Sequence, residues 1–148
     1  MAHRRERHGR GLRGPLALPN PFTGVPAALP QRPRSAEFFA ACVRAAVARV
    51  NEDCPQALVA IDIGIEDVPS AQGPWSRDRV PLAAALSPGP GRHGQVVLFR
   101  RPLERRARTR RGLRILVFRT LVEQLAALTG LPPAEIDPSG YGADDDWD

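Results

Sequence analysis

Lysine is absent from the sequence, so all 21 basic residues are arginines, and with 16 Asp and Glu they give a formal net charge of +5. Cysteine and histidine are scarce: the two cysteines are Cys42 and Cys54, and the three histidines are His3, His8 and His93. Two cysteines with no histidine nearby make a poor zinc site. If a helix spans most of the gap between Cys42 and Cys54, a rise of about 1.5 Å per residue separates them by roughly 18 Å, which exceeds the reach of a disulfide.

Long apolar runs are also missing. No run approaches the ~20 apolar residues that a membrane span needs. The N-terminal segment GPLALPNPFTGVPAALP is too broken by proline for the core of a signal peptide. We therefore expect a soluble, cytoplasmic protein that does not enter a membrane. At 148 residues, the chain has room for about one domain with a good core.

The two ends of the chain differ in composition from its middle. Residues 1–34 carry seven Arg, one Glu, six Pro and four Gly with few large apolar residues, which predicts a disordered basic tail. Such a tail either keeps the protein soluble or acts as an arm that contacts phosphate or an acidic partner. Residues 138–148 carry acidic but no basic residues and predict a second tail, with the alternative that it folds back onto arginines. Residues 35–137 remain as the single domain.

The first element of this domain is predicted to be an amphipathic helix. Ser35 is a suitable N-cap, and Glu37 in the first turn suits the helix dipole. The helix should end near Asp53, before Pro55. Its apolar side chains follow the helical three-four spacing and are Phe39, Cys42, Val43, Ala46, Val47 and Val50.

Strands are predicted next. Residues 59–66 alternate in polarity and predict a half-buried strand, whose apolar face consists of Val59, Ile61, Ile63 and Ile65. The segment QVVLFR, residues 95–100, predicts a second and mostly apolar strand. The segment VPLAAAL, residues 80–86, fits either a short strand or one helical turn, and we favour the extended form.

Two helices are predicted to close the domain. Residues 100–114 carry eight Arg and one Glu, and Pro102 fits the first turn of a short basic helix, with a break or kink at Gly112. The following helix, Leu113 to Leu128, has apolar residues around most of its circumference and must be covered on most sides. Gly130 ends it. The order of elements predicts a small α+β domain whose last helix is central.

The order and the amino-acid sequences of these segments resemble those of the small bacterial zincin-like metallopeptidase family. The resemblance covers about residues 35–137 and rests on GIEDVP, on a Pro-Leu pair in the middle loop, on VVLFRRPLER and on the Gly130-Leu131 pair. It implies a minimal zincin fold, with a short mixed sheet packed by an N-terminal helix and a central C-terminal helix. In that family the last helix reads HTLLHEIGHHFGL, and here it reads RTLVEQLAALTGL.

The resemblance assigns three positions on the last helix. Aligning the Thr-Leu and Gly-Leu pairs leaves no gap, so the first zinc histidine of the family falls on Glu123, its catalytic glutamate on Gln124 and its second histidine on Ala127. Two histidines at i and i+4 grip one Zn²⁺ at about 2.0 Å, and the glutamate takes a proton from the metal-bound water. Ala127 offers no ligand, and Gln124 cannot act as a general base. The resemblance therefore implies a degenerate HExxH motif, with no catalytic residue, no metal ligand and no cofactor.

The first function that follows is that of a non-catalytic binding or scaffold protein, whose former cleft receives an unknown protein or peptide partner. Glu123 also has a simpler explanation, because it can form an i,i+4 surface pair with Arg119 worth about 0.3 kcal/mol. A working zinc peptidase would instead need a site rebuilt from His93 with carboxylates such as Asp67 or Asp137.

A second function is the weak binding of nucleic acid or of an acidic partner. The basic tail and the arginine run would contact phosphates in a salt-dependent way that does not depend on sequence. The candidate contact residues are Arg105, Arg106, Arg108, Arg110 and Arg111. A run of charge is more often a solvated surface, and both interpretations stay open at this point.

Overall fold

The structure is a computed structural model that describes residues 35–70 and 80–145. Its elements, in chain order, are α1 (Ser35–Asp53), the 3-10 helix η1 (Pro55–Leu58), β1 (Ile61–Glu66), β2 (Ala83–Leu86), β3 (Gly94–Phe99), α2 (Arg100–Arg106), α3 (Arg110–Thr129), α4 (Pro133–Ile136) and the 3-10 helix η2 (Tyr141–Ala143). The described residues belong to one compact unit, Arg34–Asp148. None of the described helices is long and apolar enough to cross a membrane.

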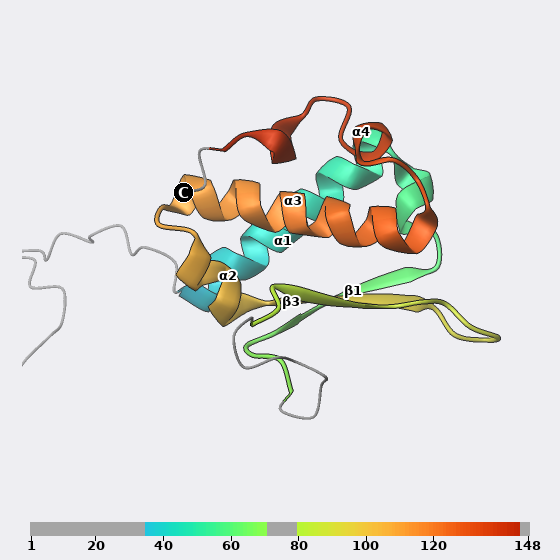
Figure 1. The fold of residues 1–148 in the computed structure, drawn as a ribbon, viewed down its shortest axis with the longest axis horizontal. Helices are drawn as coiled ribbons and strands as arrows, with labels where there is room; N and C mark the ends of the chain where they lie inside the picture. Colours follow the sequence, from blue (N-terminus) through green and yellow to red (C-terminus); the bar gives the residue numbers. More distant parts are fainter. Residues whose placement is uncertain (1–34, 71–79, 146–148) are drawn as a thin grey trace, which may run out of the picture. The chain divides into compact units, whose positions relative to one another are not determined.

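The strands form one mixed sheet in the order β1-β3-β2. β1 runs parallel to β3, β2 runs antiparallel to it, and Val96 of β3 lies between Ile63 and Ala85. Figure 1 shows α1 and α3 on the same side of this sheet. Val96 and Leu98 are fully buried in the core that these helices form with it. The small α+β fold predicted from the sequence is therefore confirmed, and the segment 80–86 contains the strand β2.

The helix α1 ends at Asp53, as predicted, and begins at Ser35, which was predicted as its N-cap. Its buried side chains include five of the six predicted residues, together with Phe38, and Val47 is half-buried. Ser35 is the first helical residue, and its hydroxyl accepts a hydrogen bond from Arg100 Nη1 at 3.2 Å. Cys42 and Cys54 are buried free thiols. Burial raises the pKa of the Cys42 thiol, although the Arg114 guanidinium opposes this shift.

The helix α3 is central, as predicted, but the prediction of its start was wrong. It begins at Arg110 rather than Leu113, and Thr109 caps it, because the Thr109 hydroxyl accepts a hydrogen bond from the Gly112 backbone N–H at 2.9 Å. Gly112 is therefore buried within the first turn, and the break between α2 and α3 lies before Thr109. The helix ends as predicted at Gly130, whose φ of 75° is left-handed.

The strand β1 is shorter than predicted and is less buried. It begins at Ile61, because Ala60 has a φ of 57° and turns the chain before the strand. Val59, which was assigned to the buried face, is 71% exposed, and Ile65 is 40% exposed. Only Ile61 and Ile63 of the predicted face pack against the core. For Ile65 the reason is that, among the strands the structure describes, β1 lies at the edge of the sheet, so its apolar side chains are covered from one side only.

The chain remains folded beyond residue 137, where the acidic tail was expected to begin. The Tyr141 ring packs edge-on against Phe118 with 5.4 Å between centroids. Arg111 Nη2 lies 3.6 Å from Asp144 Oδ2, and Arg119 Nη1 lies 3.8 Å from Asp145 Oδ1. The described part of the acidic segment thus folds back onto arginines, which was the alternative to a tail. The basic tail predicted over residues 1–34 and the last residues, 146–148, lie outside the described residues.

Candidate functional site

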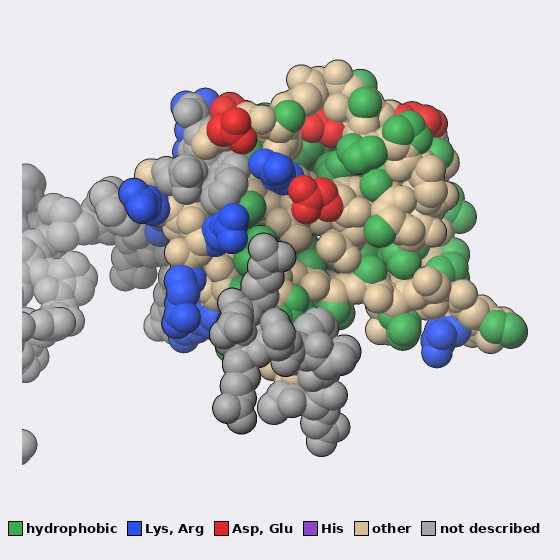
Figure 2. Space-filling view, viewed as in Figure 1, with side chains coloured by type: hydrophobic (Ala, Val, Ile, Leu, Met, Phe, Trp, Pro, Cys, Tyr) green, Lys and Arg blue, Asp and Glu red, His purple; other side chains and the backbone are tan. Residues whose placement is uncertain are grey.

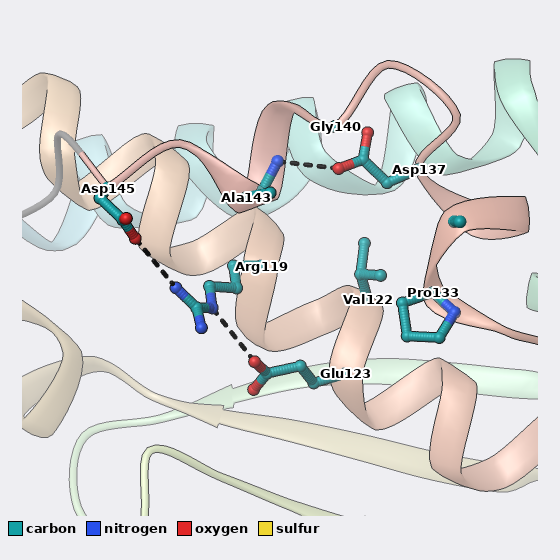
Figure 3. Close-up of a pocket in the computed structure, with 10 residues that line it drawn as sticks. Arg119, Val122, Glu123, Pro133, Asp137, Gly140, Ala143 and Asp145 are labelled. Atoms are coloured by element: carbon teal, nitrogen blue, oxygen red, sulfur yellow. Dashed lines mark hydrogen bonds and ion pairs between the residues drawn. The ribbon is translucent and has the colours of Figure 1, made fainter.

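The three motif positions lie in the C-terminal half of α3. Glu123 and Ala127 are exposed, and Gln124 is half-buried. Glu123 and Ala127 share one helical face because they are four residues apart. The Glu123 carboxylate accepts a hydrogen bond from Arg119 Nε at 3.2 Å, which is the i,i+4 pair expected from the sequence. Figure 3 shows that Arg119 bridges Glu123 and Asp145.

A cavity of about 390 Å³ adjoins Glu123. One wall comes from α3, through Arg119, Val122 and Glu123, and the other from the chain between Pro133 at the start of α4 and Asp145 after η2 (Figure 3). Among the described residues that line it there is no Ser, Cys, His or Lys. The sequence did not reveal this cavity, because the part of its second wall beyond residue 137 was assigned to a tail.

Asp137 shapes the second wall of this cavity. Its Oδ2 accepts a hydrogen bond from the Gly142 backbone N–H at 2.8 Å, and its Oδ1 accepts from the Ser139 hydroxyl at 2.9 Å and from the Tyr141 backbone N–H at 3.2 Å. The carboxylate is buried and serves as the anchor of the turn that leads to η2. The Asp-Pro-Ser-Gly sequence that begins here is a turn signal that could have indicated this role.

The structure does not bring together the residues from which a metal site was to be rebuilt. His93 Nδ1 lies 3.3 Å from Asp62 Oδ1, Asp67 holds Arg100, and Asp137 anchors its own turn. Among the described residues, no group of three or more His, Cys, Asp or Glu is arranged to hold a metal ion. His3 and His8 lie outside the described residues.

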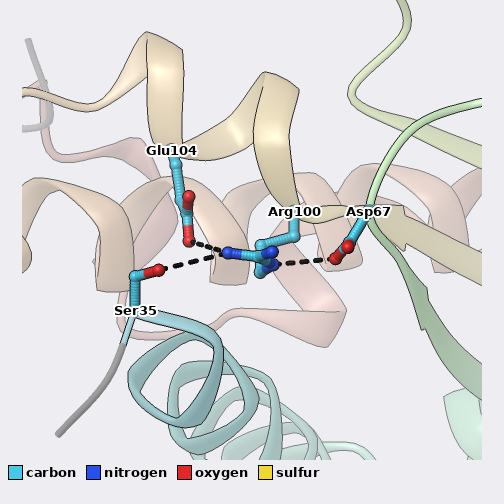
Figure 4. A network of polar contacts seen from close by, with 4 residues as sticks. All are labelled: Ser35, Asp67, Arg100 and Glu104. Atoms are coloured by element: carbon cyan, nitrogen blue, oxygen red, sulfur yellow. Dashed lines mark hydrogen bonds and ion pairs between the residues drawn. The ribbon is translucent and has the colours of Figure 1, made fainter.

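Arg100 is a buried charge that was predicted as the last residue of the second strand and as part of the basic run, whereas it is the first residue of α2. Its Nε donates to Asp67 Oδ1 at 2.9 Å, and its Nη1 donates to Glu104 Oε1 and to the Ser35 hydroxyl, both at 3.2 Å (Figure 4). These bonds connect the start of α1, the end of β1 and α2. Donation from Arg100 holds the pKa of Asp67 below its usual value, and the bond to Asp67 raises the pKa of Arg100. The feature of the sequence that could have indicated the burial of Arg100 is its position directly after an apolar strand.

The predicted polyanion contacts lie close together but differ in their surroundings. All five are exposed, on α2, on the linker after it and at the start of α3. Figure 2 shows Arg side chains gathered over this part of the molecule. The guanidinium of Arg110 lies 4.4 Å from the centre of the Phe38 ring, and Arg111 pairs with Asp144. Part of the predicted basic surface therefore also serves intramolecular contacts.

Comparison with known proteins gives one family match. A model of the family described as zincin-like metallopeptidase matches residues 44–143. No curated protein matches the chain. The matched range runs from the middle of α1 to the end of η2, so it includes the whole sheet, α3 and every residue that lines the cavity except Asp145.

Proposed function

The chain belongs to the zincin-like metallopeptidase family, and we propose that it is a member without peptidase activity that works as a binding or scaffold protein. The observation that carries this proposal is the chemistry of α3. In the ungapped alignment with the family motif, the side chains are a carboxylate at Glu123, an amide at Gln124 and a methyl group at Ala127. An amide does not titrate near neutral pH and therefore cannot accept a proton as a general base.

These residues do not fit a zinc ion. A catalytic zinc site uses three protein ligands, commonly two imidazoles on one helical face with a third residue. Here Glu123 is the one candidate ligand at the motif positions, and its carboxylate is held by Arg119 at 3.2 Å. Replacing that pairing with a metal contact would also bring the metal ion close to a guanidinium of the same charge sign. We therefore assign no step of a hydrolytic mechanism to these residues.

What the site supports is binding. The cavity of about 390 Å³ combines an apolar wall at Val122 and Pro133 with charges at Arg119 and Glu123. Clefts of roughly 300–1,000 Å³ with apolar walls and a few polar groups are typical of ligand sites. We assign this cavity to a short peptide segment of a protein partner, because the charged pair provides both a donor and an acceptor beside an apolar surface.

The test compares the unmodified protein with a variant in which the motif is rebuilt. After removal of any affinity tag, the unmodified protein should contain far less than one equivalent of zinc by elemental analysis. The triple variant Glu123→His, Gln124→Glu and Ala127→His places two imidazoles at i and i+4 and should titrate zinc measurably, although weakly without a third ligand. A cooperative thermal melt checks that the variant folds.

Two results would contradict the proposal. Stoichiometric zinc that survives dialysis of the unmodified protein would indicate a working metal site and favour a peptidase. A folded triple variant that binds no more zinc than the unmodified protein would show that these positions are not those of the family motif. Glu123 would then be only the surface partner of Arg119.

A second candidate function is weak binding of nucleic acid or of another polyanion. The observation that favours it is the grouping of Arg105, Arg106 and Arg108 on one exposed region, without a carboxylate within ion-pair distance of Arg105 or Arg108 among the described residues. Such a surface would bind phosphates through charge alone, with affinity that falls steeply with salt.

A further inference from the structure

The outer edge of β1 carries backbone groups that point away from the sheet. The Gly94 backbone N–H donates to the Ala60 carbonyl at 2.8 Å, and Ile61 lies opposite Gly94. In a parallel ladder this geometry turns the backbone groups of Ala60, Asp62, Gly64 and Glu66 toward β3. The N–H and C=O groups of Ile61, Ile63 and Ile65 therefore point outward. Within residues 35–70 and 80–145, no strand pairs with this edge.

The same isoleucines line an apolar groove beside the edge. The groove encloses about 600 Å³ between β1 and α1, and its α1 wall includes Val43 and Val47. Ile65 is 40% exposed there, although it lies on the face of the sheet that the helices cover. Outward backbone groups and uncovered apolar side chains thus occur together along β1. An additional strand would form hydrogen bonds with the backbone groups and would cover the apolar side chains.

The opposite edge of the sheet is protected in a way that β1 is not. β2 has only four residues and is flanked by Pro81 and Pro88, which cannot donate backbone hydrogen bonds. β1 has six residues, contains no proline, and carries its acidic side chains on the face away from the helices. An edge of this kind is a template for strand addition.

We propose that β1 pairs antiparallel with β1 of a second copy of the chain, about a two-fold axis through Ile63, so that the two sheets become continuous. This interface is separate from the cavity beside Glu123 and does not depend on the function assigned to it. Figure 1 shows β1 at the border of the sheet.

Self-pairing fits this strand because its outward groups are symmetric about Ile63. In the proposed register, Ile63 lies opposite Ile63 of the second copy, and Ile61 lies opposite Ile65. All three isoleucines then exchange backbone hydrogen bonds, and their side chains extend the apolar groove across the axis. On the other face, Asp62 lies opposite Gly64 and Glu66 lies opposite Ala60, so no two carboxylates face each other, a pairing that would be destabilising.

The first experiment measures the mass of the full chain against concentration by analytical ultracentrifugation. The unmodified protein should form a dimer. Ile65→Lys should raise the dissociation constant of the dimer about tenfold or more, since a charge then lies among the apolar side chains where the two β1 strands meet. The matched control is Leu86→Lys on β2, because Leu86 is similarly exposed, at 47%. The control should dimerise like the unmodified protein. A monomer at all concentrations, or equal dissociation constants for the two variants, would overturn the proposal.

The second experiment tests the register by disulfide cross-linking. In the proposed pairing of the two β1 strands, Asp62 of one copy and Gly64 of the second copy form a non-hydrogen-bonded pair. Their Cα atoms would lie about 4.5 Å apart, which is within disulfide reach. A mixture of Asp62→Cys and Gly64→Cys chains should give a mixed cross-linked dimer under mild oxidation. Either variant alone should give little, and Cys42 and Cys54 are buried. Cross-linking that is no stronger in the mixture than in the single variants would refute the register and the two-fold axis.

Discussion

The arginines of this protein differ widely in what their side chains contact. Arg100 is buried and holds Asp67, Glu104 and Ser35. The guanidinium of Arg49 lies 4.2 Å from the centre of the Tyr141 ring, where its flat face covers an aromatic side chain. The count of 21 arginines therefore overstates the number of guanidinium groups that can contact a partner, since several of them already make contacts within the fold.

Local sequence signals predicted some residues well and others not at all. The Arg119–Glu123 pair and the end of α3 at Gly130 follow from neighbours within four residues and are confirmed. The partners of Arg100 could not be predicted in this way, because Asp67 lies 33 positions away and meets Arg100 only after β1 and β3 have paired.

Gly130 is a residue at which the backbone conformation decides the effect of a substitution. Its φ is 75°, so Gly130→Ala places a side chain in the left-handed region and should lower the free energy of unfolding by about 1 kcal/mol. The control is Gly64→Ala, where a Cβ would meet only Val97 Cγ2 at 3.9 Å. Urea denaturation compares both with the unmodified protein. Equal losses of stability would contradict the conformational explanation.

At the scale of elements, the periodicity of apolar residues predicted whether a segment forms a helix or a strand better than it predicted the first residue of that element. The type of α1 was predicted because one apolar face is repeated along the helix, and its end was predicted because Pro55 follows Asp53. The start of α3 was missed because Gly112 was given more weight than Thr109, whose cap provides about 1 kcal/mol. The expectation for β1 failed at Val59 because Ala60 turns the chain before the strand begins. It failed at Ile65 because alternation cannot distinguish an edge strand from a central one.

Only one wall of the candidate site could be predicted from the sequence. The family resemblance located Glu123, Gln124 and Ala127 on a helix, and that helix is α3. The opposite wall of the cavity was not predicted, because α4 is a single turn and the segment after it is held by hydrogen bonds to one carboxylate, Asp137. Short elements that depend on individual polar contacts leave no periodic pattern in a sequence.

The ion pair that joins the end of β1 to α2 should make stability depend on acid. The pKa of Asp67 is lowered in the folded protein, mainly by donation from Arg100, so its charged form contributes stability above the ordinary carboxyl pKa of about 3.9. This contribution is lost as the pH falls through the lower pKa of the folded state. Asp67→Asn should therefore be less stable than the unmodified protein at pH 7, and the two should converge in strong acid.

Chemical denaturation between pH 7 and pH 2 provides the measurement for Asp67→Asn. Because Asp67 is largely exposed, the difference at neutral pH should be small and should shrink with added salt. Glu66→Gln is the control, since it removes the neighbouring carboxylate of the same strand and leaves the bond to Arg100 in place. A difference that stays constant across the pH range would argue against the ion pair.

At the scale of the whole molecule, the distribution of charge limits what the basic surface can bind. The arginines of α2 and of the start of α3 lie together, but Asp144 and Asp145 fold back onto Arg111 and Arg119 at its border. Acidic residues from the end of the chain thus reduce the positive potential next to the region that would meet phosphate. The consequence is that any binding of a polyanion should be weak and easily removed by salt.

The polyanion hypothesis predicts a measurable salt slope that depends on particular arginines. Binding to a generic DNA duplex should be detectable at low salt and should almost vanish at physiological salt. The variant Arg105→Gln with Arg108→Gln should reduce the slope of log K against log salt by up to about 2, because each lost phosphate contact removes about 0.9. Adding Arg106→Gln and Arg110→Gln should reduce it further, although Arg110→Gln also removes the contact with Phe38.

Arg44→Gln on α1 is the control, since Arg44 lies on the groove beside β1 and its replacement should leave the salt slope unchanged. No binding even at low salt would leave these arginines as a solvated surface.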